Sequence, residues 1–201
     1  MVAVIDYGVG NLYSVSKAFA ALGAEVTVTS DAQTLNAADK IVLPGVGAFG
    51  DCLANFRSIG LADTFMALVR AGKPILGICV GMQILFETGE ESPEAVGLGI
   101  FRGTVRKINA VGEKIPHMGW NKLILEEHEG SLWTGLDKEP YVYFVHSYHA
   151  VPEDESIITA RTQYGELVTA AVHKDNIWAT QFHPEKSGDV GLKILANFLA
   201  V

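Results

Sequence analysis

Two short stretches, far apart along the chain, carry the residue types that nucleophilic catalysis needs. The first is GICVG, in which Cys79 stands between Gly77 and Gly81 where an apolar stretch gives way to a helical pattern. The second is HPE near the C-terminus, which holds His183 and Glu185. A thiol can attack a carbonyl carbon, an imidazole can move the proton, and a carboxylate can orient the imidazole. Together they predict acyl transfer with a cysteine nucleophile.

The turn around Cys79 would place its sulfur where it can react. A nucleophile between two glycines, at the turn from a strand into a helix, adopts a strained backbone, and larger flanking residues would collide with neighbouring elements. We expect Cys79 at the carboxyl end of a sheet and at the N-terminus of a helix over 80–86, whose dipole favours a thiolate. The N–H of Val80 would then face an oxyanion on the attacked carbonyl. The alternative is a buried cysteine without a role, which is common.

The pair formed by His183 and Glu185 has two interpretations. Residues two apart on an extended chain share a face, and Pro184 lacks an N–H and holds the preceding residue extended, so a strand should end at His183. The imidazole could then meet Cys79 at one sheet edge, with Glu185 accepting from its other nitrogen. Taken alone, the pair could equally be a strand end with a solvated carboxylate. Combined with the turn at Cys79, the catalytic interpretation is favoured.

The stretch LPGVGAFG at 43–50 matches the Gly-x-Gly-x-x-Gly pattern of dinucleotide sites. We reject that function because no acidic residue closes a second strand about 20 residues further on. Pro44 also interrupts the turn from strand to helix that this pattern needs. The backbone amides of Gly45, Val46 and Gly47 can instead point into a neighbouring site at the same sheet edge. We therefore interpret the loop as the source of a second oxyanion donor.

The elements that must position these residues change in character along the chain. In the first half, apolar stretches alternate with helical periods, which predicts parallel strands joined by helices. Strands are expected over 2–7, 24–29, 40–43 and 74–79, and helices over 11–22 and 61–69. Later strands are expected over 104–108, 141–146, 157–162, 168–173 and 178–182, with a hairpin around 174–176 and a closing helix over 190–199. The predicted fold is α/β, with a mostly parallel mixed sheet and antiparallel strands added in the second half.

Composition narrows the possible partners. The chain has 201 residues, of which 49% are hydrophobic and 19% charged, so we expect one globular domain over 1–201. A net charge of −8, with 15 basic residues spread along the chain, argues against nucleic acid, and no apolar run approaches the roughly 18 residues of a membrane span. The start lacks a basic leader with a cleavage site, so we expect a cytoplasmic protein.

Metal and disulfide chemistry are also disfavoured, and no cofactor is expected. Cys52 and Cys79 are too few for a disulfide framework or for a thiolate zinc site. The other histidines show no metal-ligand spacing with the cysteines and are expected to be structural or on the surface: His117, His128, His146, His149 and His173.

The motifs together resemble the class I, or triad, glutamine amidotransferases over essentially the whole chain. The family motif is Gly-x-Cys-x-Gly-Met-Gln followed by a distant His-Pro-Glu. Within the family, six stretches in order are similar to the glutaminase subunits of imidazole glycerol phosphate synthase: IDYGVGNLYSV, LPGVGAFGD, GICVGMQILFE, PHMGWN, YFVHSYHA and QFHPEKSG. The resemblance implies a three-layer sandwich. Val80 stands where leucine is more usual, which puts only the local packing in question.

The resemblance also implies the chemistry. Cys79 would attack the side-chain amide of glutamine, and His183 would protonate the leaving ammonia. Water activated by the same histidine would hydrolyse the thioester to glutamate, while Glu185 orients the imidazole. The amides of Val80 and of Val46 or Gly47 would form the oxyanion hole. The resemblance assigns substrate binding to Gly45, Gly47, Gln83, Ser147 and Tyr148.

Gln83 lies four residues after Cys79, so the two share one helical face and the Gln83 amide could reach the α-substituents of glutamine. The alternative for Gln83 is simple exposure to solvent.

A partner should receive the ammonia directly, because ammonia loses its nucleophilicity once protonated. The resemblance implies a heterodimer with a (β/α)8-barrel cyclase subunit that makes imidazole glycerol phosphate for histidine biosynthesis. We expect interface surface near Asn11 and over 117–121, although Met118 and Trp120 could instead be core residues. We also expect the glutaminase activity to depend on the partner.

Three other functions would use part of the same pattern. A free-standing cysteine hydrolase would use the same thiol but would need neither Gln83 nor a partner. A glutaminase of a different synthase would share the triad and lack the PHMGWN and YFVHSY stretches. A binding module without catalysis would tolerate the loss of Cys79.

Overall fold

The computed structural model describes residues 1–126 and 132–201, so His128 lies outside the described residues. The helices are α1 (Leu12–Ala21), α2 (Ala32–Ala37), α3 (Phe49–Ser58), α4 (Ala62–Arg70), α5 (Val80–Gln83) and α6 (Gly188–Ala200), with 3₁₀ turns η1 (Glu155–Ile157) and η2 (Pro184–Lys186). The strands are β1 (Val2–Ile5), β2 (Val26–Thr29), β3 (Lys40–Gly45), β4 (Ile75–Cys79), β5 (Thr88–Gly89), β6 (Gly103–Lys107), β7 (His117–Lys122), β8 (Ile124–Leu125), β9 (Tyr141–His146), β10 (Tyr148–Pro152), β11 (Ile158–Tyr164), β12 (Glu166–Lys174) and β13 (Ile177–Thr180).

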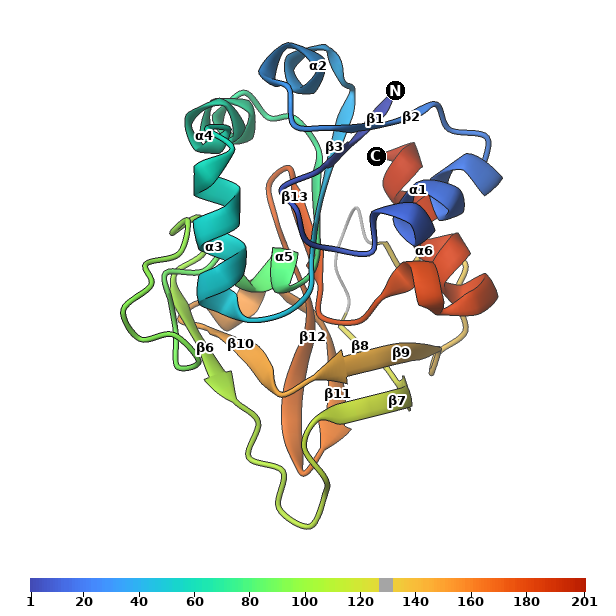
Figure 1. Cartoon of the computed structure of the whole chain (residues 1–201). Coiled ribbons are helices and arrows are strands. Elements are labelled where there is room, and N and C mark those ends of the chain that lie inside the picture. The colour runs from blue at the N-terminus through green and yellow to red at the C-terminus, as the bar shows by residue number, and fades with distance from the viewer. Residues whose placement is uncertain (127–131) are drawn as a thin grey trace.

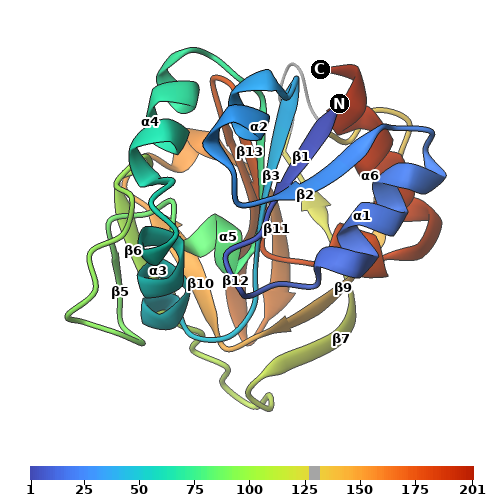
Figure 2. The same ribbon diagram turned by 45° about the horizontal axis from the view of Figure 1, so that its top comes forward.

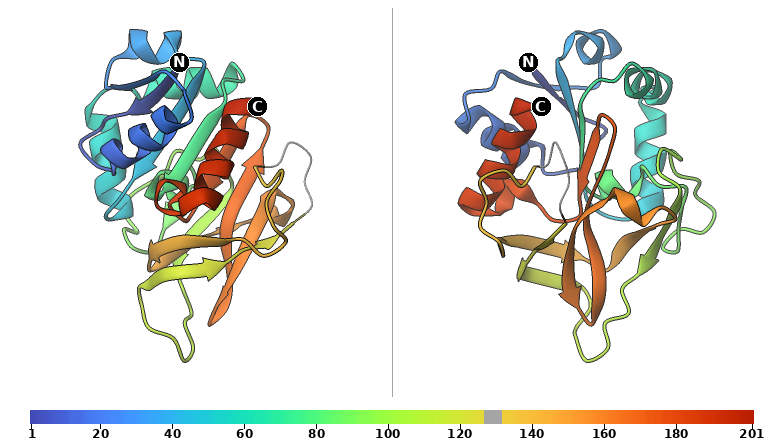
Figure 3. Two further views of the ribbon diagram at one scale, coloured as in Figure 1. Left: turned by 90° about the vertical axis from the view of Figure 1, so that its right-hand side faces the viewer. Right: turned by 180° about the vertical axis from the view of Figure 1, so that it is seen from behind.

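The centre of the molecule is one mixed sheet between two layers of helices (Figures 1 and 2). Its strand order is β2-β1-β3-β4-β13-β12-β11-β8. The first five strands pair in parallel, and β12, β11 and β8 are added antiparallel. Helices α1 and α6 cover one face of the sheet, and α3 and α4 cover the other (Figures 1 and 3). The predicted α/β sandwich with a mostly parallel mixed sheet is therefore confirmed.

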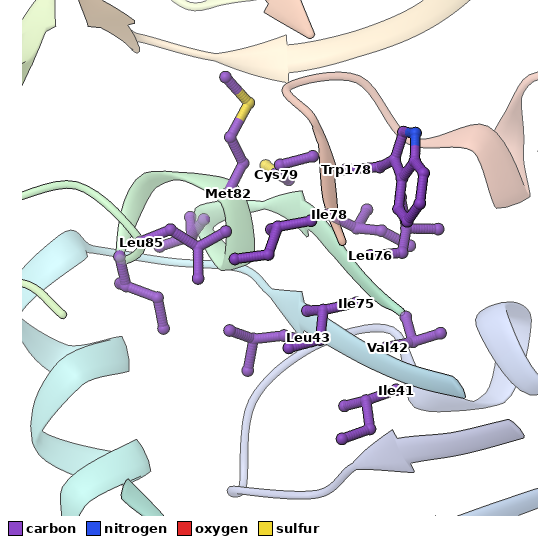
Figure 4. Packing of buried hydrophobic residues seen from close by; sticks show 14 of the residues in the cluster. Ile41, Val42, Leu43, Ile75, Leu76, Ile78, Cys79, Met82, Leu85 and Trp178 are labelled. Atoms are coloured by element: carbon purple, nitrogen blue, oxygen red, sulfur yellow. The ribbon is translucent and has the colours of Figure 1, made fainter. Parts of the chain in front are cut away.

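The middle strands are held by apolar side chains on both of their faces. Ile41, Val42 and Leu43 of β3 are fully buried, as are Ile75 and Leu76 of β4 (Figure 4). A parallel strand covered by helices on both sides reads as a continuous apolar run, which is the pattern that these segments carry. The rigid middle of the sheet thus ends at Cys79, which lies beside Met82 at the margin of this cluster (Figure 4).

Strand β13, in the second half of the chain, pairs in a different direction from the one predicted. We expected 178–182 among the antiparallel additions, and this is wrong, because β13 pairs in parallel with β4. The partners run from Ile177 beside Ile75 to Thr180 beside Ile78. The hairpin at 174–176 is confirmed, since Lys174 of β12 pairs with Ile177 across the turn. The hairpin reverses the chain, so β13 points the same way as β4 and ends at the same sheet edge.

Several elements differ from the sequence prediction in extent or place. The segments at 104–108 and 141–146 form β6 and β9, which belong to small sheets, β10-β6-β5 and β7-β9, outside the main one. Helices α2 and α3 and strand β7 were not predicted. Pro44 lies inside β3, where it pairs with Ile78, and α3 begins soon afterwards at Phe49. The expectation that Pro44 interrupts the turn from strand to helix is therefore wrong.

Helix boundaries follow ordinary capping rules where the sequence predicted them. The side chain of Asn11 accepts from the N–H of Ser14 at the start of α1, and Gly23 follows its end with φ of 81°. Helices α4 and α6 match the predicted segments closely.

Among the described residues, no single helix is long and apolar enough to span a membrane. Helices α3 and α4 meet that test only when they are joined, and they bend by 95° at the break between them.

Candidate active site

The backbone at Cys79 has the conformation that the flanking glycines predict. Cys79 has φ of 56° and ψ of −114°, a region that side chains rarely adopt and that costs about 1–3 kcal/mol. It is the last residue of β4, and α5 begins with the next residue. This strain survives because the sheet on one side and α5 on the other fix the backbone. The sharp turn lifts the thiol to the carboxyl end of the sheet.

Gly81 permits this turn because α5 lies directly against β3. A Cβ atom at Gly81 would lie 1.9 Å from the carbonyl oxygen of Leu43, a backbone atom that cannot move alone. A Cβ at Gly77 would be less crowded, with its closest neighbours at 3.1 Å. The collision expected from the sequence is therefore confirmed most clearly for Gly81.

We expect Gly81→Ala to destabilise the fold by about 3 kcal/mol, because overpacking here forces backbone to shift. Gly60→Ala is the control: Gly60 lies in the turn between α3 and α4, with φ of 72°, and nothing is within 4 Å of its added Cβ. The control should lose about 1 kcal/mol, from backbone strain alone. Urea unfolding of both variants measures the difference, and equal losses would show that the contact between β3 and α5 is unimportant.

Helix α5 is shorter than predicted. It covers Val80–Gln83, and the chain then turns at Ile84 instead of continuing to Phe86. The expectation of a helix over 80–86 is wrong, and with it the expectation of a substantial helix dipole at Cys79, because a dipole grows from aligned peptide units over several turns. Activation of the thiol must therefore come mainly from a neighbouring side chain.

That neighbour is His183, which the end of β13 brings to the same edge. Its backbone N–H donates to the carbonyl oxygen of Tyr143 at 3.0 Å, and its own carbonyl accepts from Ser187 Oγ at 2.7 Å. With φ of −101° and ψ of 96°, His183 is extended before Pro184, as predicted. These bonds to Tyr143 of β9 and to Ser187 thus fix the backbone of His183 at the sheet edge.

Glu185 completes a buried group of three side chains. Its Oε1 lies 2.8 Å from Nδ1 of His183, although Glu185 belongs to the turn η2 and not to an extended strand. Only 4% of Cys79 is exposed, and the side chains of His183 and Glu185 are exposed by 2% and 1%. A solvated carboxylate, the alternative for Glu185, is excluded by this burial.

The protonation of His183 is set by its two acidic neighbours. Burial by itself would lower the pKa of His183, but the Cys79 sulfur and the Glu185 carboxylate outweigh burial and raise the pKa to about 10. Within the described residues, Nε2 of His183 is buried without a hydrogen bond of ordinary geometry. Because Nδ1 is bound to Glu185, Nε2 is the ring nitrogen left to meet the sulfur and a substrate.

A pocket of about 280 Å³ opens in front of the thiol. Its lining includes nearly all of the residues predicted for the site, namely Val46, Gly47, Cys79, Val80, Gln83, Ser147, Tyr148 and His183. Glu185 is not in the lining and supports His183 from its Nδ1 side.

Gly45, which was also predicted for the site, is not in the lining either. A Cβ on Gly45 would lie 2.5 Å from the backbone nitrogen of Gly81, so its lack of a side chain serves the packing of α5 on β3.

Gln83 is buried, so the alternative of simple solvent exposure is wrong. Its Nε2 donates to the carbonyl oxygen of Tyr148 at 3.1 Å and to Oε1 of Gln181 at 3.0 Å. Both protons of the Gln83 amide are therefore used inside the protein, and its oxygen is the atom left for a ligand. Gln181 in turn donates from Nε2 to the sulfur of Cys79 at 3.7 Å.

Gln181 was not predicted, although the sequence holds a signal for it. It lies two residues before His183, and residues at that spacing on extended chain share a face. Gln181 does not line the pocket, but four residues that do were also missed: Glu91, Pro116, Val145 and His146. Glu91 accepts from the backbone N–H of Phe49 at 2.9 Å, which ties the start of α3 to the pocket.

The loop after β3 is held by the second cysteine. The thiol of Cys52 donates to the carbonyl oxygen of Val46 at 3.3 Å. Burial raises the pKa of Cys52 to about 11, so the thiol keeps its proton and remains a donor. In a trans peptide the C=O and the next N–H point in opposite directions, so the N–H of Gly47 points away from Cys52. Gly47 has φ of 98° and lines the pocket.

Strand β7 separates its side chains into two environments. Met118 and Trp120 are 61% and 56% exposed, so the alternative that they are core residues is wrong. His117, at the start of the same strand, is buried. Asn11, at the cap of α1, is half-buried.

Within residues 1–126 and 132–201, no three His, Cys, Asp or Glu side chains gather into a group that could hold a metal ion.

Comparison with known proteins identifies relatives that match almost the whole chain. The family model "Glutamine amidotransferase class-I" matches residues 3–201. The subunit HisH of imidazole glycerol phosphate synthase from Methanothermobacter thermautotrophicus is 51% identical over 201 residues, which cover 100% of this chain and 98% of the relative. The subunit HisH from Aquifex aeolicus is 50% identical over 196 residues, or 97% of this chain and 94% of the relative.

The fold has close counterparts among solved structures. A crystal structure of a glutamine amidotransferase superposes with a TM-score of 0.79 at 23% identity, covering 100% of this chain and 98% of that one. At this level of identity the likeness concerns the fold alone.

Proposed function

Since the chain belongs to the class I glutamine amidotransferase family, we propose that residues 1–201 form one amidotransferase domain in which Cys79, His183 and Glu185 are the catalytic triad. The chain is a glutaminase subunit of imidazole glycerol phosphate synthase and serves histidine biosynthesis. Each step of the glutaminase reaction can be assigned to atoms in and around the pocket.

The first half of the reaction would form a thioester. The sulfur of Cys79 attacks the side-chain amide carbon of glutamine, and the carbonyl oxygen becomes an oxyanion. His183, protonated because its pKa is raised to about 10, gives the proton on Nε2 to the leaving nitrogen. The carbon–nitrogen bond breaks, ammonia departs, and the glutamyl group stays on Cys79.

The second half would release glutamate. Nε2 of His183, now without its proton, takes one from a water molecule, which attacks the thioester carbon. The carbon–sulfur bond breaks, and the sulfur returns to its starting state beside the protonated imidazole. In both halves, Oε1 of Glu185 accepts from Nδ1 of His183 at 2.8 Å and so holds the orientation of the ring.

The oxyanion would be bound by two backbone N–H groups in both halves. Val80 supplies one, as the residue that follows the nucleophile. We assign the second to Gly47, because the bond from Cys52 turns the carbonyl of Val46 to the cysteine side and the next N–H to the other. A pair of such donors contributes by stabilising charge that develops only in the transition state.

Substrate recognition would use Gln83, Ser147 and Tyr148 in the lining of the pocket. The amide oxygen of Gln83 can accept from the α-ammonium group of glutamine, because the Gln83 nitrogen is already used by Tyr148 and Gln181. Ser147 and Tyr148 lie at the start of β10 and also line the pocket. For Gly45 the packing of α5 on β3 supports a structural role and not direct contact with glutamine.

As a subunit, the chain works in a complex. We infer that the partner is a (β/α)8-barrel cyclase that receives ammonia directly and forms a heterodimer with this chain. The exposed side chains of Met118 and Trp120 on β7 suit such an interface, since aromatic and methionine side chains are enriched at the core of protein contacts. They lie on the strand next to β9, which ends at the pocket residue His146.

The parallel register of β4 and β13 is the observation that carries this proposal. Because Ile78 pairs with Thr180, the chains beyond the two strands deliver Cys79 and His183 to one pocket. A binding module without catalysis would need neither the strained Cys79 nor a buried acid behind the imidazole. A free-standing hydrolase would need neither an exposed Trp120 nor a partner.

The proposed function is tested by combining the chain with a barrel cyclase subunit and the phosphorylated ribonucleotide that the cyclase converts, and by supplying either glutamine or ammonium. With glutamine, we expect glutamate and imidazole glycerol phosphate in equal amounts. Ammonium should support product formation without this chain. We also expect the cyclase to increase glutamate release. Equal glutaminase rates with and without the cyclase would refute this dependence, and glutamate release without any product would favour a free-standing hydrolase.

A further inference from the structure

A buried pair of histidines lies at the wall of the glutamine pocket and has no part in the proposed chemistry. His117 and His146 face each other across β7 and β9, with Nδ1 of His117 at 3.0 Å from Nε2 of His146. His146 also reaches the carbonyl oxygen of Tyr148 from its Nδ1 at 2.8 Å. Both rings are almost completely buried, and His146 lines the pocket. Two buried imidazoles in contact require a defined arrangement of their protons.

The protons can be assigned from both ends of this pair. The carbonyl of Tyr148 can only accept, so Nδ1 of His146 must carry its proton. At the other end, Nδ2 of Asn121 lies 3.2 Å from Nε2 of His117 and also donates to the carbonyl of Gln163. Oδ1 of Asn121 accepts from the N–H of Lys122 at 2.8 Å, which fixes the amide in this orientation. His117 therefore accepts at Nε2 and donates from Nδ1 to His146.

The two imidazoles are neutral in this arrangement. Burial lowers the pKa of His117 to about 4 and that of His146 to about 3. Each ring thus has one proton, and both protons are on Nδ1. The direction of donation is then the same along the whole path, from Asn121 through the two rings to Tyr148.

The path continues to the nucleophile. The Tyr148 carbonyl accepts a second hydrogen bond, from Nε2 of Gln83, and the other proton of that amide goes to Gln181, whose Nε2 faces the sulfur of Cys79. The carbonyl of the preceding residue, Ser147, accepts from the N–H of Ile108 at 3.0 Å. The backbone carbonyls of Ser147 and Tyr148 therefore both accept hydrogen bonds from other parts of the protein. These bonds fix the backbone of this segment where it lines the pocket.

We propose that His117 and His146 are positioning residues for glutamine: with both protons on Nδ1, they hold the Tyr148 carbonyl and, through it, the amide of Gln83 in the orientation that binds the substrate. This inference rests on the proposed glutaminase function. The residues touch neither the thiol nor the attacked carbon, so they act on substrate binding more than on the chemical steps.

A packing role for His117 is the competing explanation, and two substitutions separate it from the proposal. The His117 ring stacks on Tyr164 at 4.0 Å and on Phe144 at 4.6 Å between ring centres. His117→Phe keeps an aromatic ring between them and removes the donor. His117→Asn loses the stacking, but its amide nitrogen can occupy the place of Nδ1 and still donate to His146. If the hydrogen bond matters, His117→Phe should raise KM for glutamine more than His117→Asn does. If only packing matters, His117→Asn should be the more damaging substitution.

We expect His117→Phe to raise KM for glutamine about tenfold in the assembled synthase, the factor given by one lost hydrogen bond of ordinary strength, with kcat within about twofold. His117→Asn should keep KM within about twofold of the wild type even if its melting temperature falls. His173→Phe is the matched control, because His173 stacks on Trp178 at 4.5 Å near the 174–176 turn, and its KM should not change. A KM for His117→Phe equal to or below that of His117→Asn would overturn the proposal.

A spectroscopic readout tests the proton arrangement without any activity. Long-range ¹H–¹⁵N correlation of the imidazoles at neutral pH should show His117 and His146 neutral and protonated on Nδ1. In His117→Phe, the ¹⁵N signal of His146 Nε2 should shift, because that atom loses its donor. A proton on Nε2 of His146 in the wild type would also overturn the proposal. A wild-type complex without glutamate release would instead refute the proposed function and leave this readout valid.

Discussion

Cys79→Ala should abolish glutamate release by the assembled synthase, with a loss on the order of 10⁵-fold or more, as expected when the nucleophile of a triad is removed. The methyl group of alanine has no electron pair to attack the amide carbon of glutamine. Imidazole glycerol phosphate formation from ammonium should continue, because that step belongs to the partner. The measurement is glutamate release and ammonium-dependent product formation on the same preparation.

The fold should tolerate this substitution. Alanine has the same Cβ as cysteine, so the strain at φ of 56° is unchanged, and the buried sulfur makes no hydrogen bond shorter than the 3.7 Å contact from Gln181 within the described residues. A melting temperature close to that of the wild type, with partner binding retained, would show that the lost activity is chemical. Residual glutamate release within tenfold of the wild type would remove Cys79 from the mechanism.

Glu185→Gln should reduce glutamate release by about 10²-fold to 10⁴-fold. Glutamine is nearly isosteric, but its amide cannot supply the negative charge that helps to hold His183 protonated. Since that carboxylate raises the pKa of His183, its loss should lower the pKa from about 10 and move the alkaline decline of the rate to lower pH. A pH–rate profile of the variant and the wild type measures this shift.

The same pKa determines how stability responds to pH. The folded pKa of His183 is above its ordinary value of about 6.5, so its contribution to stability is fully present below about pH 6.5 and is lost as pH rises through about 10. In Glu185→Gln, the contribution of His183 to stability should be lost completely at a lower pH than in the wild type. The free energy of unfolding in urea, measured between pH 6 and pH 10, tests this.

Glu166→Gln is the control for Glu185→Gln. Glu166 lies 3.5 Å from Nε2 of His149, another buried histidine, and pairs with Arg106 at 2.6 Å. Glu166→Gln can reduce the stability of the protein, but its rate should fall at the same alkaline pH as the rate of the wild type. An unchanged pH profile in Glu185→Gln would mean that Glu185 does not set the protonation of His183.

Most of the framework could be predicted from local patterns. The glycines on either side of Cys79 indicated a strained turn from strand to helix, and the apolar stretches of β3 and β4 indicated parallel strands joined by helices. Pro184 specified an extended His183. Each of these rests on the steric properties of a few adjacent residues, which the sequence contains in full.

The errors come mainly from pairings between distant segments. The strand pattern of β13 is the same whether it pairs in parallel or antiparallel, and only the complete sheet decides that it inserts beside β4. Helix α3 is an error of another kind, because Phe49, Cys52, Leu53 and Phe56 have helical spacing and the helix was predictable. Its first turn overlaps the glycine pattern of the preceding loop, which is typical of irregular chain.

The polar path behind the pocket could not be found in the sequence. Asn121, His117, His146, Gln83 and Gln181 come from β7, β9, α5 and the chain after β13, and their contacts arise from the small β7-β9 sheet packing beside the main one. The two-residue spacing of Gln181 and His183 could have indicated Gln181, but no spacing along the chain indicates the contacts among Asn121, His117, His146 and Gln83.

The most direct test asks where the glutamyl group is during turnover. The assembled synthase is mixed with radiolabelled glutamine, quenched in acid within the first turnovers, and digested for peptide mapping. We expect the label on the peptide that contains Cys79, removable by hydroxylamine as a thioester and absent from Cys79→Ala. Label on the peptide that contains Cys52, or steady glutamate release with no labelled peptide, would contradict the proposed mechanism.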